Sequence, residues 1–408
     1  MKNAPWPRMI ALVDMNAFFA SIEQADHQEW QGLPVGITNG RTGTCIITCS
    51  YEARAYGIKT GMRIKEARQR CPDFIQIPAQ PRRYAEVSTR IMAALEDITP
   101  VIEVFSVDEA FLELTACQQL WGSAGRMGQL IKETVHKASG LSCSVGISGD
   151  KTTAKYAAKV NKPDGLTIIP PWEARERLAP LPVTELCGIN TGIGDFLAER
   201  NVYTCGDMAK LPISELGRRF GNPGRRIWYM CQGEDPEKVI TRVPPPKSMG
   251  HGKVVPPNTR DKAVIHTYLL HMSEKVATRL RRHQMEARVF SIGLRVTNGW
   301  VGDRLKIAHP TQDGHRIMEL CEIVLNDYWQ GEGVFQVQVT ALQPQMKGQQ
   351  SSFFEEDTRK TDAFNQVMDC VNERYGEFTL APARLLNRSE MPNVIAPAWK
   401  PFGHRKTI

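Results

Sequence analysis

Residues 101–114, VIEVFSVDEAFLEL, constrain the fold more than any other stretch, because they place two adjacent carboxylates between two apolar, strand-like runs. Neighbouring side chains on a straight strand point to opposite faces. Asp108 and Glu109 can therefore act on one centre only at a strand end or in a tight turn, and residues 106–109 are predicted to form such a hairpin bend. An isolated Asp-Glu pair in a hairpin is most often a solvated turn, so this pair needs further support.

A third carboxylate follows another strand-like run near the N-terminus. Residues 9–20, MIALVDMNAFFA, place Asp14 at the end of a short hydrophobic run that leads into an apolar helix start. If this strand lies beside the 101–114 hairpin in one sheet, Asp14, Asp108 and Glu109 meet at neighbouring strand ends. Three hard oxygen donors without His or Cys suit Mg²⁺, which takes the rest of its shell from water and substrate phosphates. The sequence therefore predicts a magnesium site.

The composition indicates an ordinary globular protein. The 408 residues, 42% hydrophobic and 23% charged, suffice for two to four domains. No apolar run approaches the ~20 residues of a membrane helix, and the N-terminal MKNAPWPR lacks the apolar core of a secretory signal. A cytoplasmic protein without a membrane partner is expected. The ten cysteines form no CxxC pair, which predicts reduced thiols and no structural zinc.

The positive charge of the chain is concentrated in one region. Residues 241–306 hold thirteen Lys and Arg against four Asp and Glu, a net charge of +9 that exceeds the +7 of the whole chain. Such a regional excess is the footprint of a polyanion-binding module. A solvated basic face would have the same composition, so the charge alone does not decide between the two.

Short strands and helices alternate over the first 170 residues. Strand-like runs at 33–38 and 44–49 flank a glycine-containing turn and predict a small hairpin or sheet. Helices are expected from Tyr51, from Pro81 and over 150–161, with a strand over 141–147. These elements do not repeat as parallel strand–helix–strand units, so an α+β sheet with helices on one face is predicted.

After Pro170 and Pro171 the chain changes to short helices and glycine-rich turns. Residues 181–194, LPVTELCGINTGIG, followed by an amphipathic helix around 195–201, resemble a helix-hairpin-helix, whose backbone N–H groups can bind a phosphate without reading sequence. The usual Gly-x-Gly of the hairpin is here Gly188-Ile189-Asn190. Asn tolerates a positive φ, so the turn remains possible.

A proline-rich stretch, TRVPPPKS at 241–248, predicts an extended linker. Beyond it, strands at about 249–255, 287–297, 303–308 and 333–343, with helices at about 261–284 and 312–329, predict a compact α+β domain that carries most of the excess positive charge. One amphipathic helix, 362–376, is expected in the remaining tail.

Taken together, these segments resemble the Y-family, lesion-bypass DNA polymerases, of the type of bacterial DNA polymerase IV and the catalytic subunit of DNA polymerase V. The motifs VDMNAFFASIEQ, SYEARAYGIKTGM, FSVDEAFLEL and VGISGDKTTAKYAAKVNKPDG occur in the order typical of the family, and the resemblance covers about residues 9–344. It implies an α+β, multidomain right-hand polymerase: palm 1–18 and 82–170, fingers 19–81, helical thumb 171–240 with the helix-hairpin-helix, linker 241–247, little finger 248–345 and C-terminal tail 346–408.

The resemblance also assigns a catalytic centre. Asp14, Asp108 and Glu109 would hold two Mg²⁺ ions, with the Met15 carbonyl as a further ligand. Two such cations can neutralise a triphosphate, activate the primer 3′-hydroxyl and stabilise the leaving pyrophosphate. The second acid common in the first motif is Asn16 here, as in the DNA polymerase V type, and the family does not need it as a metal ligand.

The implied nucleotide contacts come from three motifs. Tyr51, Arg54 and Lys162 match triphosphate-binding positions, with Thr48 assisting, since an Arg fork and a Lys point charge suit phosphate oxygens. Phe19 matches the steric gate, a bulky ring that leaves no room for a ribose 2′-hydroxyl. Phe18, the neighbouring residue, is included in the predicted substrate-binding set and is expected to pack beside Phe19. Cys45 and Ile47 are expected to line the roof of the fingers over the nascent base pair.

Partner contacts are expected in three places. The hairpin would bind DNA through Gly188, Asn190 and Gly192, and the basic domain through Lys247, Lys253 and Arg295. In the tail, QSSFF at 350–354 is similar to the Gln-x-x-Leu-Phe peptide that docks on a sliding clamp, which would use Gln350, Phe353 and Phe354. An ordinary linker is the alternative for this short match.

The predicted function is low-fidelity, template-directed DNA synthesis past damaged bases, in DNA repair and damage tolerance, by a monomeric polymerase core acting on primer–template DNA and deoxynucleoside triphosphates. The alternative is a catalytically inactive DNA-binding scaffold subunit of a lesion-bypass complex. Such a subunit should have lost acids or triphosphate contacts, and this chain keeps both sets. Which lesion is bypassed, which base is inserted and whether accessory subunits are needed stay open.

Overall fold

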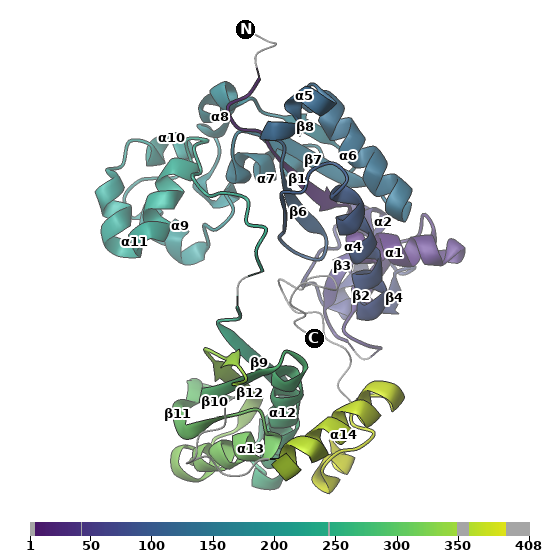
Figure 1. The fold of residues 1–408 in the computed structure, drawn as a ribbon, viewed down its shortest axis with the longest axis vertical. Helices are drawn as coiled ribbons and strands as arrows, with labels where there is room; N and C mark the ends of the chain where they lie inside the picture. The colour runs from purple at the N-terminus through teal and green to yellow at the C-terminus, as the bar shows by residue number, and fades with distance from the viewer. Residues whose placement is uncertain (1–4, 42, 244, 349–358, 389–408) are drawn as a thin grey trace. The chain divides into compact units, whose positions relative to one another are not determined.

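The chain divides into two compact units, one up to Val243 and one from Pro244 to Glu390 (Figure 1). The computed structural model describes residues 5–41, 43–243, 245–348 and 359–388. Sheets of the first unit run through residues 10–168, and the sheet of the second unit lies within residues 248–346. No described helix has both the length and the apolar character needed to cross a membrane.

The largest sheet of the first unit has the strand order β5-β6-β1-β7-β8. Its strands are β1 (Ile10–Met15), β5 (Ile102–Val104), β6 (Glu109–Glu113), β7 (Cys143–Ser148) and β8 (Leu166–Ile168). The central strand β1 pairs antiparallel with both β6 and β7, and β5 pairs antiparallel with β6. The predicted hairpin between the two strands around Asp108 is therefore confirmed.

Helices lie on both faces of this sheet, so the prediction of helices on one face was wrong. Helices α4 (Pro81–Leu95) and α6 (Ala124–Ser139) share a core with one face of β1, which presents Ala11 and Val13. Helix α7 (Lys151–Val160) connects β7 to its parallel neighbour β8 and packs on the opposite face, against Ile10 and Leu12.

Gly146 explains the position of α7. It lies in β7 opposite Leu12, on the face that α7 covers. A Cβ atom at this position would overlap the backbone of Ala154 and Ala158 of α7. The missing side chain and the alanine-rich helix surface together allow the helix backbone to touch the sheet. The contact is between a strand and the helix that follows it, and the alternation of strands and helices in the sequence does not show on which face of the sheet that helix packs.

The segment between β1 and α4 forms a smaller sheet with the order β3-β2-β4. Its strands are β2 (Val35–Thr38), β3 (Ile46–Cys49) and β4 (Ile75–Pro78); its helices are α1 (Phe18–Asp26), η1 (Gln28–Trp30), α2 (Tyr51–Ala55) and α3 (Ile64–Arg70). The expected hairpin is confirmed, because β2 and β3 pair antiparallel. Ser50 caps α2 by accepting a hydrogen bond from the Ala53 amide, which explains why the helix begins at Tyr51.

Residues 171–230 form four short helices and one longer, kinked helix around a separate small core. They are α8 (Pro171–Leu178), η3 (Val183–Glu185), α9 (Thr191–Ala198), α10 (Cys205–Met208) and α11 (Ile213–Met230); η2 (Thr115–Cys117) and α5 (Gln118–Trp121) precede α6. Asn190 does not take the positive φ expected of it. Its φ is −87°, and its side chain caps α9 by accepting from the Ile193 amide, so the helix begins earlier than predicted.

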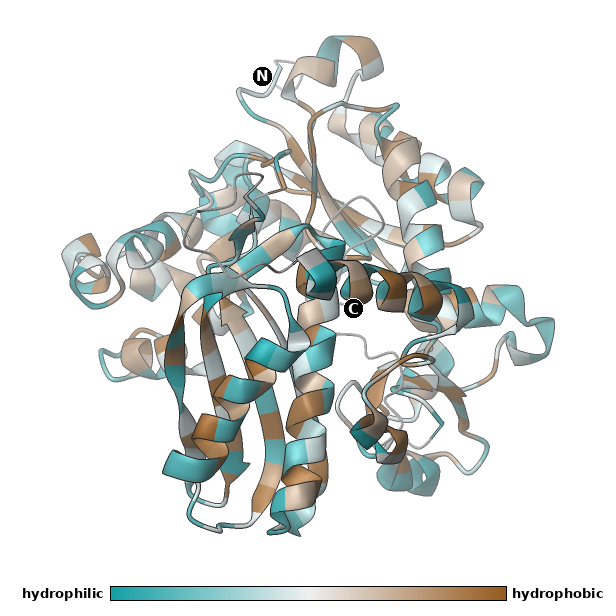
Figure 2. Cartoon of the chain, turned by 60° about the horizontal axis from the view of Figure 1, so that its bottom comes forward, coloured by the Kyte–Doolittle hydropathy of each residue, from teal (hydrophilic) through white to brown (hydrophobic). Residues whose placement is uncertain are grey.

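The second unit is a sheet with helices, and hydrophobic and hydrophilic residues alternate along its strands (Figure 2). The strand order is β11-β10-β12-β9, with β13 paired to β10. Its elements are β9 (Ser248–Thr259), α12 (Lys262–Arg282), β10 (Met285–Val296), β11 (Gly299–Thr311), α13 (Gly314–Ile323), the π-helical η4 (Val324–Tyr328), β12 (Val334–Leu342), β13 (Gln345–Met346), α14 (Arg359–Tyr375) and η5 (Ala383–Asn387). Helix α12 contacts β9, β10 and β12, so one face of the sheet is covered.

We expect Gly146→Ala to destabilise the first unit by about 1–3 kcal/mol or more, because the added methyl must displace the backbone of α7. Chemical denaturation followed by circular dichroism measures the change. Gly125→Ala is the matched control. It lies in α6, its Cβ would meet nothing closer than 3.8 Å, and alanine favours a helix. Equal stability of the two variants would contradict the close contact.

Candidate active site

The three predicted carboxylates come from two neighbouring strands. Asp14, near the end of β1, is the register partner of Glu109, the first residue of β6. The Met15 amide donates to the Asp108 carbonyl at 2.9 Å, which ties the residue before β6 to β1. The two strand ends expected to meet therefore do so. In β1, Asp14 lies two residues after Leu12, so both occupy the face that α7 covers.

The bend that carries Asp108 is held by short-range hydrogen bonds. The amides of Phe105 and Ser106 donate to the Glu109 carbonyl at 3.0 and 3.1 Å. The Ser106 hydroxyl donates to Asp108 Oδ1 at 2.6 Å. Burial raises the pKa of Asp108, and this hydrogen bond from Ser106 opposes that shift. Asp108 therefore lies in a bend just before strand β6, as predicted from the sequence.

Two lysines provide the positive charge of the site. Lys162, in the loop after α7, places Nζ 2.5 Å from Asp14 Oδ1. Lys155, in α7, places Nζ 2.6 Å from Glu109 Oε2. Sequence analysis identified Lys162 but missed Lys155. The signal that could have found it is the helical spacing within DKTTAKYAAKVN, where Lys155 follows Lys151 by four residues and therefore shares its face.

The pKa of Asp14 is raised to about 7, chiefly because the carboxyl group is buried. Lys162 opposes this shift, whereas the charges of Glu109 and Asp108 add to it. A cation placed among these oxygens would favour the ionised carboxylates. The electrostatics of the site therefore favour the binding of a cation.

Among the described residues there is no group of three or more His, Cys, Asp or Glu side chains already arranged to hold a metal ion. Asp14 and Glu109 instead direct oxygens to lysine ammonium groups. The donor set still fits magnesium, because it consists of hard carboxylate oxygens, without thiolate or imidazole. Asn16 has a different role, since its side chain donates to Ser142 Oγ at 3.0 Å and accepts from Ser144 Oγ at 2.9 Å.

The two phenylalanines of the first motif begin α1 and are both buried. The Phe19 ring stacks on Tyr84 of α4, with 4.4 Å between ring centroids and 13° between planes. Phe18 lies beside it, 5.6 Å away between centroids. The Tyr84 hydroxyl donates to Glu23 Oε1 at 2.5 Å, and Gln80 Nε2 donates to Glu23 Oε2 at 3.0 Å. The Phe19 ring is thus held by a buried, hydrogen-bonded support that sequence analysis did not identify.

Tyr51 and Arg54 lie together on α2. The guanidinium carbon of Arg54 is 4.6 Å from the centroid of the Tyr51 ring. The Tyr51 hydroxyl is buried and has no hydrogen-bond partner in the described part of the chain. Burial raises the pKa of Tyr51, the positive charge of Arg54 opposes this shift, and the charge of Asp14 adds to it. Thr48 lies in β3, two residues before the Ser50 cap of α2.

The predicted DNA contacts fall in separate places. Gly188 takes a φ of +93°, Asn190 caps α9, and Gly192 lies within that helix. Lys247 is exposed just before β9. Lys253 of β9 is paired with Val337, so it lies on the sheet face opposite to that of the exposed Arg295 of β10, which pairs with Gln336. The predicted clamp residues Gln350, Phe353 and Phe354 lie outside the described residues.

Comparisons with known proteins agree with this arrangement. Residues 13–159 match the impB/mucB/samB family model, and residues 246–352 match the model of that family's C-terminal domain. DNA polymerase IV of Moorella thermoacetica is 34% identical over 377 residues, which cover 90% of this chain and 94% of the relative. The DNA polymerase IV of Methanoculleus marisnigri is 36% identical over 292 residues, covering 71% of this chain and 81% of the relative.

A solved Y-family DNA polymerase chimera matches the fold with a TM-score of 0.71 and 27% identity, and the match covers 83% of this chain and 99% of the chimera. The fold is therefore that of a multidomain α+β polymerase, as predicted. The chain belongs to the Y family of DNA polymerases. It is accordingly a DNA-binding transferase, and the two relatives from Moorella and Methanoculleus are both DNA polymerases IV.

If Phe19 is the steric gate, Phe19→Ala should raise ribonucleotide incorporation by at least about tenfold, because the ring would no longer fill the space beneath the sugar. Tyr84→Leu should raise it less, since it removes only the stacked support. Single-nucleotide insertion with matched ribo- and deoxynucleotides measures the ratio. Tyr84→Phe is the control that keeps the stacking ring. Unchanged sugar discrimination in Phe19→Ala would rule out the gate.

Proposed function

We propose that the protein is a template-directed, low-fidelity DNA polymerase that extends primers past damaged bases by two-metal nucleotidyl transfer. The observation that carries the proposal is the meeting of Asp14, Asp108 and Glu109 at paired strand ends beside two lysines. Membership of the Y family supports the translesion role. The expected site of action is the cytoplasm, and the expected form is a monomeric core.

Asp14, Asp108 and Glu109 would hold two Mg²⁺ ions, together with the Met15 carbonyl. When bound, the ions would supply charge neutralisation for the attacking and leaving oxygens of an in-line phosphoryl transfer. The chain's own contribution is to fix the carboxylates. The β1–β6 register sets the spacing of Asp14 and Glu109, and Ser106 orients Asp108.

The triphosphate of the incoming nucleotide would be bound by Tyr51, Arg54 and Lys162, with Thr48 assisting. The buried Tyr51 hydroxyl has no hydrogen-bond partner among the described residues, and a phosphate oxygen would accept its hydrogen bond. Lys162 already lies beside Asp14, so a phosphate bound by this lysine would lie beside the carboxylates. Phe19, supported by Tyr84, would exclude a ribose 2′-hydroxyl. Cys45 and Ile47 would line the roof over the nascent pair.

We propose the domain assignment that the resemblance to the family implies. We assign residues 1–18 and 82–170 to the palm, 19–81 to the fingers, 171–240 to the thumb, 241–247 to a linker and 248–345 to the little finger. The tail, 346–408, would carry the clamp-binding peptide. The hairpin residues Gly188, Asn190 and Gly192 are proposed DNA contacts of the thumb.

In the second unit, we assign DNA binding to the sheet face that includes Arg295. The register places Trp300 opposite Arg295, Gly302 opposite Gly293 and Arg304 opposite Ser291, so these side chains share one face. Trp300 is 51% exposed, and its ring covers Gly293, where a Cβ would lie 2.9 Å from it. An open hollow of about 330 Å³ lies here, lined by Trp300, Arg304 and Gln338 among others. Cations beside an exposed ring suit a nucleic acid backbone and its bases.

Asp108→Asn and Glu109→Gln should each abolish primer extension, because each removes a carboxylate charge from the proposed metal site without changing side-chain size. DNA affinity, measured by fluorescence anisotropy, should persist. Extension by the wild type on undamaged and singly lesioned templates, with and without a sliding clamp, tests the translesion role. Full activity in either variant would contradict the metal assignment, and an inactive, DNA-binding wild type would favour the scaffold alternative.

Removing Arg295 and Arg304 together should weaken DNA binding and flatten its salt dependence, since fewer counterions would be released. Anisotropy titrations from 50 to 200 mM salt measure the slope of log affinity against log salt concentration. We expect the magnitude of this slope to fall by roughly 1 to 2. Replacing Arg316 and Arg384, two arginines outside this sheet, with alanine is the charge-matched control. A slope that changes as much in the control as in the test variant would place the DNA contacts elsewhere.

A further inference from the structure

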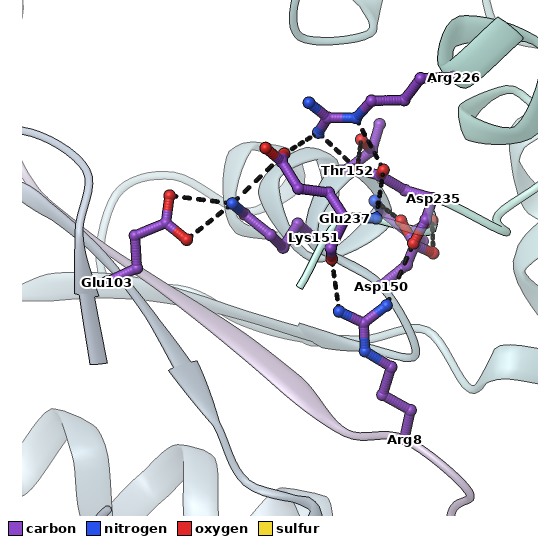
Figure 3. Close-up of polar contacts among 9 residues, drawn as sticks. Arg8, Glu103, Asp150, Lys151, Thr152, Arg226, Asp235 and Glu237 are labelled. Carbon is purple, nitrogen blue, oxygen red and sulfur yellow. Dashed lines mark hydrogen bonds and ion pairs between the residues drawn. The ribbon is translucent and has the colours of Figure 1, made fainter. Parts of the chain in front are cut away.

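Beyond α11 the chain returns to the palm as an extended segment, residues 235–240, which we call the strap. Asp235 is fully buried and accepts two hydrogen bonds from Arg226 of α11, both at 2.8 Å. Its Oδ2 also accepts from the Thr152 hydroxyl of α7 at 2.7 Å. One carboxylate thus joins the helical region to the first turn of α7 (Figure 3).

A second set of contacts, centred on a lysine, holds the strap further along the chain. Lys151 of α7 is 4% exposed and donates to both oxygens of Glu103 of β5, at 2.9 and 2.8 Å. Its Nζ also lies 3.4 Å from Glu237 Oε2. Glu103 in turn accepts from the amide of Ile240 at 2.7 Å. We call the set Glu103, Lys151, Thr152, Arg226, Asp235 and Glu237 the clasp.

The clasp holds the start of a helix that also contacts the candidate active site. Lys151, Lys155 and Lys159 are spaced by four residues and therefore share one face of α7. Lys151 binds Glu103, Lys155 binds the predicted catalytic Glu109, and Lys159 forms an ion pair with Glu185 of η3. The two sites are thus one helical turn apart on a helix whose backbone rests on Gly146.

We propose that the clasp positions α7, and through Lys155 the carboxylate of Glu109, so that the strap's attachment to the palm controls catalysis. Lys151, Thr152 and Asp235 are positioning residues in this scheme, because none of them touches the predicted reacting groups. The proposal rests on the proposed catalytic role of Glu109. It adds a route by which the segment leading to the linker acts on the catalytic centre.

The physical basis is that α7 has few ways to move while the clasp is closed. Asp150 caps the helix by accepting a hydrogen bond from the Thr153 amide at 2.9 Å. Because Asp150 provides the cap, the side chains of Lys151 and Thr152 can bind groups outside the helix. Both do so: Lys151 binds Glu103 of β5 and Glu237 of the strap, and Thr152 binds Asp235 of the strap. Rotation or sliding of α7 would break these buried contacts, which are strong because both partners are charged or shielded from water. A loosened helix would carry Lys155 away from Glu109.

The test uses full-length Asp235→Asn and Thr152→Val variants. Asp235→Asn removes the charge that binds Arg226, whereas Thr152→Val removes one hydroxyl and leaves the Asp150 cap intact. Asp369→Asn is the matched control. Asp369 accepts two hydrogen bonds from Arg281, at 2.6 and 2.8 Å, within the second unit, far in sequence from α7. Thermal unfolding establishes whether each variant is folded. If Asp235→Asn does not fold, Thr152→Val alone tests the proposal.

Two measurements are made on each folded variant. Hydrogen–deuterium exchange should become faster in residues 151–160 of both clasp variants and stay unchanged there in the control. Single-nucleotide insertion should show kcat lowered by about 10- to 100-fold, the scale of a 1 Å misplacement, with DNA affinity within about threefold of wild type. Arg226→Lys, which keeps the charge, should lose less kcat than Arg226→Gln.

Faster exchange in α7 together with a lower kcat would support the proposal. Faster exchange with unchanged kcat would overturn it, because α7 would then be clasped without positioning Glu109. Unchanged exchange, or an equal loss of kcat in Asp369→Asn, would overturn it as well. If the wild type itself incorporates no nucleotide, the proposed function fails. The exchange measurement is independent of that result, and unchanged exchange in α7 would show that the clasp does not hold the helix.

Discussion

The antiparallel pairing of β1 with β6 is the constraint on which the candidate active site depends. It places Asp14 opposite Glu109 and ties Met15 to Asp108 through a backbone hydrogen bond. A register shift of one residue would turn Asp14 to the other face of the sheet, into the core formed with α4 and α6. The apolar residues that precede Asp14 therefore do more than fill a core, because their burial fixes which face the carboxylate occupies.

Burying several carboxylates at one place is costly. Burial is the chief cause of the raised pKa values of Asp14 and Asp108, and the charges of neighbouring acids add to both shifts. The chain offsets it with lysines that arrive from α7 and from the loop that follows it. These ammonium groups lie beside Glu109 and Asp14, two of the carboxylates to which metal binding is assigned above. The same electrostatic demand thus accounts for the resting ion pairs and for the proposed affinity for cationic and phosphate-bearing ligands.

Local sequence patterns predicted the parts of the site that short-range physics determines. The hairpin bend at Asp108, the strand before Asp14 and the helix after Asp150 all follow from apolar runs, turn residues and caps, and the structure confirms them. Long-range contacts were not predictable in this way. The stack of Tyr84 on Phe19 and the pairing of Lys155 with Glu109 join residues 65 and 46 positions apart. Asn190 shows a local failure, since capping α9 prevailed over a positive φ.

Helix α7 shows how one short element can serve several needs at once. Its small residues let its backbone rest on Gly146, and this closeness brings its lysine-bearing face within reach of β5 and β6. A bulkier helix would stand further from the sheet, and the lysine side chains would then have a longer distance to span to both strands. The alanines are therefore as important to the electrostatics as the lysines. A pattern that reads as an ordinary alanine- and lysine-rich helix thus gains its specificity from the glycine in the strand before it.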